Sequence, residues 1–143
     1  MSERSKLTQL PGAVQFTART AAIGAGTTGI MPVFPNLTGA TFQVTEGYFV
    51  PDALVTGAGT NNMSLAIQNR GTAGTGTTAV TSTLAFSSAS VTAAQAAQKA
   101  FTVSATAANL LIANGETLAL VKTEAGSGLA LPAGVVVVKG RFV

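Results

Sequence analysis

TFQVTEGYFV, residues 41–50, is the stretch that decides the fold, because apolar and polar side chains alternate along it. This period of two is that of a β-strand with one buried face. Gly47 within this stretch is a candidate site for a β-bulge. It also predicts which side chains face the core, namely Phe42, Val44, Tyr48 and Val50.

The same kind of pattern recurs on both sides of this stretch. Residues 63–68, MSLAIQ, alternate strictly, whereas the valine run in VVVVKGRFV, residues 135–143, is apolar on both faces, as in a strand that is covered on both sides. Shorter strands are predicted at residues 13–19, 80–86, 101–103 and 118–122. About seven short strands separated by Gly, Asn and Pro turns predict an all-β protein with a single β-sandwich.

Two local signals predict features other than strands. Asn114-Gly115 lies between two apolar runs and predicts a hairpin turn, because both residue types tolerate a positive φ. Residues 88–100, SASVTAAQAAQKA, are predicted to form a loop with one or two helical turns that Ser90 caps.

The N-terminal part lacks this regularity. Residues 1–12 are polar and end at Pro11-Gly12, and residues 21–39 contain four Gly and two Pro, which disfavour long regular elements. We therefore expect an N-terminal arm and irregular segment at residues 1–40 and a β-sandwich domain at residues 41–143. Apolar side chains in the first segment are candidates for packing against a neighbouring chain: Leu7, Leu10, Val14, Phe16, Ile30, Met31, Val33 and Phe34.

The composition excludes most catalytic chemistry. The chain has 143 residues with no Cys and no His, which removes disulfides, thiolate nucleophiles, imidazole metal ligands and Ser-His-Asp triads. The Gly-rich stretches lack the Lys-Ser/Thr ending of a phosphate-binding loop. The carboxylates lie in the arm, in turns or near strand ends, at Glu3, Glu46, Asp52, Glu116 and Glu124. We expect no enzyme activity, no cofactor and no metal.

The charge pattern limits the partners. Eight Lys and Arg and five Asp and Glu give a net charge of +3, but the basic residues are scattered and no aromatic residues interleave them, so we expect no direct nucleic-acid binding. No stretch approaches the roughly eighteen apolar residues that a membrane-spanning helix needs. Residues 1–16 lack the apolar region of a signal peptide, so cytoplasmic synthesis is the default expectation.

Thirteen charged residues are few for the surface of a protein of this size. A monomer of 14.2 kDa exposes roughly 6,800 Å², so much of that surface must be neutral. Protein interfaces are depleted in charge at their centres, and subunit association would bury such a surface. We expect an oligomer whose association depends little on salt.

Three longer motifs carry a resemblance to a known family. They are YFVPDALVTGAGTNNMSLAIQNRG from residue 48, TSTLAF from residue 81 and ANGETLALVKTEAGSGLALPAGVVVVKGRF from residue 113. In these motifs the chain resembles the small capsid decoration, or cement, proteins of tailed bacteriophages. The matching positions are Pro51, Asn62, Ile67, Asn69, Gly71, Leu84, Phe86, Gly115, Glu116, Leu118, Gly126, Gly128, Pro132 and the valines from Val135 to Val138.

The resemblance implies a jelly-roll-like β-sandwich that forms a homotrimer, binds the major capsid protein on the outer face of an expanded phage head and clamps neighbouring capsomers. It also implies an N-terminal arm that reaches across the capsid, so the eight apolar side chains named above become candidates for protomer or capsid contacts. The expected location is the exterior of the virion, after synthesis in the host cytoplasm.

Two other classes of protein stay open at this point. A different virion β-sandwich, such as a tail or fibre subunit with a glycan-binding or adhesion role, would be present in few copies per particle. A free soluble binding module would be a monomer at micromolar concentration.

Overall fold

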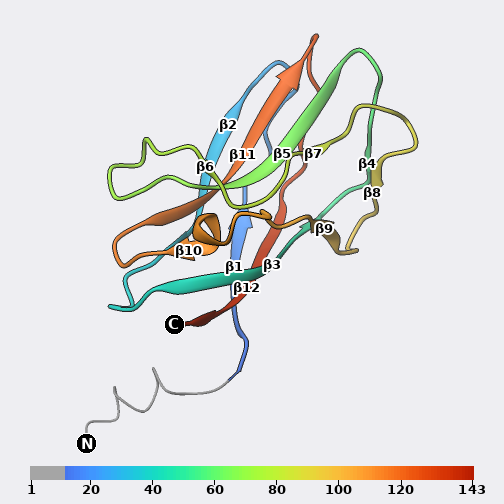
Figure 1. Cartoon of the computed structure of the whole chain (residues 1–143). Helices are drawn as coiled ribbons and strands as arrows, with labels where there is room; N and C mark the ends of the chain where they lie inside the picture. The colour runs from blue at the N-terminus through green and yellow to red at the C-terminus, as the bar shows by residue number, and fades with distance from the viewer. Residues whose placement is uncertain (1–11) are drawn as a thin grey trace, which may run out of the picture.

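Two antiparallel sheets pack face to face in the computed structural model, which describes residues 12–143 (Figure 1). The first sheet has the order β1 (Val14–Thr20), β12 (Gly134–Phe142), β3 (Phe42–Pro51) and β10 (Leu111–Ile112), with β9 (Lys99–Phe101) also on β3. The second has the order β2 (Gly29–Pro35), β11 (Thr117–Ala125), β5 (Asn62–Asn69) and β6 (Thr78–Ala79), with β7 (Leu84–Ala85) also on β5. The predicted β-sandwich is confirmed.

The strand pairs are nested within one another. The first strand pairs with the last, β1 with β12, and then β2 pairs with β11, β3 with β9 and β10, and β5 with β6 and β7. The chain thus forms one long hairpin whose strands alternate between the two sheets, and rolling up such a hairpin gives a jelly roll. A small ribbon of β4 (Val55–Thr56) and β8 (Thr92–Ala93) lies outside the two sheets.

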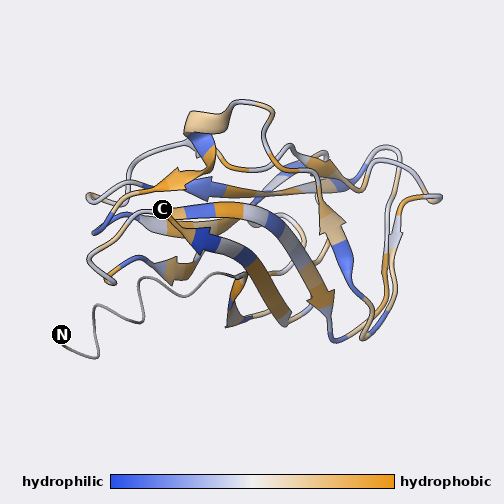
Figure 2. Ribbon diagram, turned by 60° about the horizontal axis from the view of Figure 1, so that its bottom comes forward, coloured by the Kyte–Doolittle hydropathy of each residue, from blue (hydrophilic) through white to orange (hydrophobic). Residues whose placement is uncertain are grey.

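Aromatic side chains from both sheets meet in the core. Phe16 of β1 stacks on Phe34 of β2 with ring centroids 4.0 Å apart, and Phe42 of β3 lies edge-on to both rings at 5.2 and 5.3 Å. Phe142 of β12 lies 5.4 Å from Phe42. Aromatic pairs in these geometries stabilise a core beyond the area that they bury. Figure 2 shows the alternation that supplies them, as hydrophobic and hydrophilic bands along the strands.

The predicted boundary at residue 40 is wrong, because residues 14–35 supply a strand to each sheet. Pro32 and Pro35 do not prevent β2 from forming, since β2 is an edge strand that needs backbone hydrogen bonds on one side only. A register shift opposite Leu118/Ala119 accommodates the additional residue Val33. The predicted arm at residues 1–11 lies outside the described residues.

A β-bulge in β3 reverses the predicted facing of its second half. Lys139 pairs with Glu46 and Gly140 with Val44, which leaves Thr45 without an opposed partner. Phe42 and Val44 face the core as predicted, but after the bulge the core-facing side chain is that of Phe49. Tyr48 and Val50 point outward, so their predicted burial is wrong. The bulge lies at Thr45 instead of Gly47.

The two local predictions also need correction. Residues 88–100 contain β8, the start of β9 and turns but no helix, and Ala96 has a φ of 56°, which a right-handed helix does not accommodate. The predicted turn at Asn114-Gly115 does form, with a φ of 90° at Gly115, but it joins β10 of the first sheet to β11 of the second and is therefore a crossover, not a hairpin. The structure's single helix within residues 12–143 is a 3₁₀ turn, Ala107–Leu110, and no described helix is long and apolar enough to span a bilayer.

A fully buried lysine joins the connection between β1 and β2 to β11. Lys122 of β11 donates hydrogen bonds from Nζ to the carbonyl oxygens of Gly24 (2.9 Å) and Thr27 (2.8 Å), and it forms an ion pair with Glu124. The Gly24 and Thr27 carbonyls belong to the connection between β1 and β2, so the ammonium joins that connection to β11. Gly128 has a φ of 72°, which favours glycine, and a Cβ there would also meet the Glu124 carboxylate.

Replacing Lys122 by Met should lower the free energy of unfolding by about 3–5 kcal/mol, because removal of one partner leaves a buried charge uncompensated. The matched control is Lys139→Met, which breaks an exposed pair with Glu46 (N–O distance 3.7 Å) and should cost less than about 1 kcal/mol. Urea unfolding of both variants measures the difference. Equal losses would contradict a special role for the buried pair.

Candidate interaction surface

The described carboxylates are all engaged in structural contacts. Their partners are Tyr48 and Lys139 for Glu46, Arg19 for Asp52, the Asn69 amide and the Ala113 N–H for Glu116, and Lys122 for Glu124. Glu3 lies outside the described residues. Within residues 12–143 no three His, Cys, Asp or Glu side chains gather in a way that could hold a metal ion.

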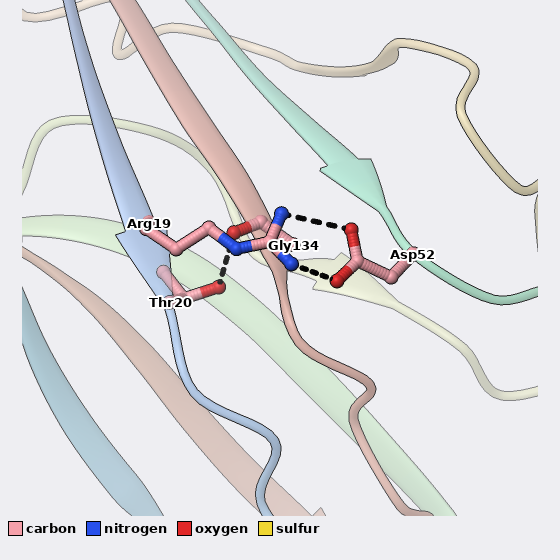
Figure 3. A network of polar contacts seen from close by, with 4 residues as sticks. All are labelled: Arg19, Thr20, Asp52 and Gly134. Carbon is pink, nitrogen blue, oxygen red and sulfur yellow. Dashed lines mark hydrogen bonds and ion pairs between the residues drawn. The ribbon is translucent and has the colours of Figure 1, made fainter.

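The outer face of the first sheet carries charge in pairs. Arg19 of β1 reaches across β12 to Asp52, which follows β3, with Nη1 2.9 Å from Oδ1 and a second contact between Nη2 and Oδ2 (Figure 3). Beside this pair, the Thr20 hydroxyl donates to the carbonyl oxygen of Gly134 at 3.2 Å. Further along, the Lys139 ammonium lies 5.4 Å from the centre of the Tyr48 ring. Five of the ten charged side chains in residues 12–143 lie on this face: Arg19, Glu46, Asp52, Lys139 and Arg141.

Eight neighbouring outward positions on the second sheet are uncharged, and the Arg70 guanidinium, just after β5, donates to the Gln68 side chain at their margin (Nη1–Oε1 3.0 Å). Strand register places Ile30, Val121 and Ala66 in one cross-strand row and Pro32, Ala119 and Gln68 in the next, and the third row adds Thr123 and Ser64. The inward positions of the same strands hold core residues such as Met63, Leu65, Leu118 and Leu120. We call the eight outward side chains the neutral face: Ile30, Pro32, Ser64, Ala66, Gln68, Ala119, Val121 and Thr123.

The central side chains of the neutral face are small and buried, and one apolar side chain, that of Ile30, projects from it. Ala66, Ala119 and Val121 are buried between their neighbours, whereas Ile30 is 53% exposed. An open hollow of about 440 Å³ lies beside Ile30, lined also by Thr28, Gly29, Val121 and Thr123, with Lys122 contributing no exposed side chain. A flat, uncharged floor next to a projecting Ile is suited to packing against another protein, since no charge has to be stripped of water.

The predicted interface residues differ in their burial and in the direction that their side chains face. Val33 and Phe34 are buried in the core of the chain itself, so their predicted role at an interface is wrong. Val14, Phe16 and Met31 are half-buried and pack against the same core. Ile30 alone among the described candidates points outward on the neutral face. Leu7 and Leu10 lie outside the described residues.

The other seven members of the neutral face were missed from the sequence. A signal for them exists, because residues 62–69 and 117–125 alternate as half-buried strands and yet carry Ser, Ala, Gln, Val and Thr at their outward positions, without a Lys or Glu. An exposed strand face normally carries such charges. The pairing of β5 with β11 then brings the uncharged positions of the two strands side by side.

The contact between Tyr48 and Glu46 on the outer face of the first sheet can be tested by titration, because Tyr48 is the single Tyr in a chain without Trp. Its hydroxyl donates to Glu46 Oε2 at 2.5 Å, and this hydrogen bond, with smaller contributions from desolvation and the carboxylate charge, raises the pKa of Tyr48 above 10.0. The contact therefore stabilises the fold below pH 10 and is lost as the pH rises through the raised pKa. In an ultraviolet titration Glu46→Ala should return the pKa towards 10.0, and Asp52→Ala should leave it unchanged. A wild-type pKa at or below 10.0 would contradict the contact.

Comparisons of the chain with protein-family models, with curated proteins and with solved structures found no match.

Proposed function

We propose that this chain is a structural subunit of a tailed-phage virion, a decoration or cement protein that binds the outer face of the head. In this proposal it acts as a homotrimer, contacts the major capsid protein and stabilises the contacts between capsomers. It has no enzymatic role and binds neither nucleic acid nor a membrane. The observation that supports the proposal is the neutral face, eight uncharged outward side chains on three neighbouring strands, with the Arg70 guanidinium at its margin, where it donates to Gln68.

The distribution of charge supports docking through the neutral face. Burying the outer face of the first sheet would desolvate five charged side chains, and ions taken out of water are repaid only when new partners match them closely. Burying the neutral face desolvates apolar and hydroxyl groups and one amide, that of Gln68, which already accepts a hydrogen bond from Arg70, and this costs less than burying five charged side chains. The first sheet then faces water, where its ion pairs are solvated, and the second faces the partner.

The fold is compatible with this role by analogy, since jelly rolls occur among viral capsid proteins and also among lectins. The aromatic residues favour the capsid role over glycan binding. All seven Phe side chains belong to the core or pack against it, so Tyr48 is the one aromatic ring on the outside of residues 12–143. Its hydroxyl is occupied by Glu46, and a platform for stacking sugars usually exposes more aromatic surface.

Phage heads assembled with and without the chain test the proposed function. A ligand that binds only the assembled lattice stabilises it in proportion to its occupancy, so heads without the chain should form but release their genome at a lower temperature on heating. Added purified protein should restore the higher temperature. Equal release temperatures at full occupancy would remove the cement role, and a few copies located on the tail would favour the adhesion role.

Ile30→Lys should weaken binding to bare heads at least about tenfold, because a charge in the neutral face must be desolvated on docking. Folding should change by less than about 0.5 kcal/mol, since the side chain is exposed. The matched control is Leu54→Lys, a somewhat more exposed apolar side chain (63%) in the turn after β3, which should bind as the wild type does. Co-sedimentation with heads measures both, and equal losses for the two variants would exclude the neutral face as the docking surface.

Light scattering of the purified chain should give about three times its mass of 14.2 kDa, with little change between low and moderate salt, because thirteen charged residues supply few ion pairs for a subunit interface. A monomer at tens of micromolar, or dissociation on adding salt, would contradict the proposed homotrimer.

A further inference from the structure

One charged side chain lies at the margin of the neutral face. Burial alternates at the end of β5, where Asn69 is buried and its neighbours Gln68 and Arg70 are half-buried, on the outward side. The Arg70 guanidinium donates from Nη1 to Oε1 of Gln68 at 3.0 Å and from Nε to the carbonyl oxygen of Gly74 at 3.3 Å. It is therefore held between a side chain of the neutral face and the loop that follows β5.

The Gly-rich loop after β5 fixes the backbone of Arg70. The Arg70 N–H donates to the carbonyl oxygen of Thr117 in β11 at 2.8 Å, and the Arg70 carbonyl oxygen accepts the Gly76 N–H at 2.8 Å. Gly71 and Gly74 have φ values of 67° and 76°, which favour glycine. A Cβ on Gly76 would lie 2.9 Å from the carbonyl carbon of Arg70, so the loop closes tightly on this residue. The stretch GTAGTG, residues 71–76, thus holds one basic side chain in position.

The Arg70 guanidinium has no carboxylate partner within residues 12–143. Its two hydrogen bonds use two of the five N–H donors of a guanidinium. Glu116, which precedes β11, accepts instead from the Asn69 amide at 2.7 Å and from the Ala113 N–H at 2.8 Å. The remaining Arg70 donors belong to Nη1 and Nη2, and paired N–H groups of this kind match the two oxygens of a carboxylate.

Docking through the neutral face would bring this guanidinium to the rim of the contact. A charged group that loses water on docking needs new hydrogen-bond acceptors, because an uncompensated charge is costly. A partner that covers the neutral face therefore has to place an acceptor opposite Arg70 or leave the guanidinium in water. A side chain that its neighbours already orient loses little conformational entropy when it binds, which favours the first arrangement.

We propose that Arg70 is a specificity-determining residue of the neutral face and binds a carboxylate that a protein of the head presents at the margin of the contact. The inference rests on the proposed function and states the chemistry of the partner, which is an uncharged protein surface with one Asp or Glu beside it. An ion pair away from the centre of a flat contact fixes how the subunit is turned on its partner, which uncharged side chains alone do not.

The surroundings of Arg70 favour a protein carboxylate over the phosphates of a nucleic acid. A nucleic acid carries a charge on every nucleotide, and proteins bind it with clusters of basic residues. The eight side chains of the neutral face are uncharged, and within residues 12–143 Arg70 is the one basic side chain that a hydrogen bond joins to them. A single guanidinium matches a single carboxylate.

Arg70→Gln tests the proposal, with Arg141→Gln as its matched control. Arg141 donates from Nε to Oε1 of Gln43 at 2.9 Å on the outer face of the first sheet, so each substitution removes one positive charge and one Arg–Gln hydrogen bond. In co-sedimentation with bare heads at low salt, Arg70→Gln should raise the dissociation constant about five- to tenfold. Arg141→Gln should leave it unchanged. Equal binding of the two variants would overturn the proposal.

Salt separates an ion pair from a merely structural effect of Arg70 on its loop. The difference in affinity between the wild type and Arg70→Gln should shrink at about 1 M salt, where the screening length is about 3 Å. Arg70→Lys should bind between these two proteins, because an ammonium keeps the charge but lacks the paired N–H groups. A loss of binding in Arg70→Gln that is the same at low and high salt would come from a disturbed loop and would overturn the proposal.

Chemical neutralisation of the partner tests for the carboxylate itself. Heads whose exposed carboxylates have been converted to amides with a carbodiimide and glycinamide should still bind Arg70→Gln, and should bind the wild type no better, as in a double-mutant cycle. An unchanged ratio of the two affinities would mean that Arg70 binds another group and would overturn the proposal. If Ile30→Lys weakens binding to unmodified heads and Arg70→Gln does not, the proposed function stands without this inference, whereas a wild type that does not bind heads would overturn both.

Discussion

The pairing of β1 with β12 is the constraint on which the remaining architecture depends. It joins residues 14–20 to residues 134–140, and every other main pair is nested inside it. Because β12 lies between β1 and β3, the first sheet is complete only when the last strand has entered it. The same pairing leaves β1 as an outer edge and brings Arg19 across β12 to Asp52 (Figure 3). Contacts so distant in sequence carry a large loop-closure cost, which makes folding slow compared with proteins of local topology.

The two faces of the sandwich divide the polar chemistry of the chain. The first sheet concentrates charged side chains outside, the second presents hydroxyl and aliphatic groups, and one ion pair is withdrawn into the interior at Lys122. This division favours one orientation of the molecule on a large partner, because the free-energy cost of desolvation is lower for the outer face of the second sheet than for that of the first. It also means that a protein with a charged content of 9% has one well-solvated face, because half of the charged side chains of residues 12–143 lie on the outer face of the first sheet.

Alternation within single strands predicted the class of fold and much of the core. The pattern around Met63, Leu65 and Ile67 was correct, since neighbouring residues of a regular strand must face opposite ways. The prediction from alternation failed in the second half of β3, where Thr45 has no opposed partner. This bulge depends on the register with β12, and it moves Tyr48 to the outside. The same limit explains Val33 and Phe34, whose burial follows from the pairing of β2 with β11 and not from the Pro-rich local sequence. The neutral face arises likewise from pairing, so no single strand reveals it.

The withdrawal of Lys122 from water has a consequence for chemical reactivity. An amine must be unprotonated and within reach of the reagent to be acylated, and the Lys122 side chain is fully buried with three oxygen acceptors around Nζ. Lys139, by contrast, is partly exposed. Acylation at position 122 therefore requires the chain to open, so the ratio of labelling at the two lysines reports how often the sandwich opens. The protein thus contains its own probe of opening.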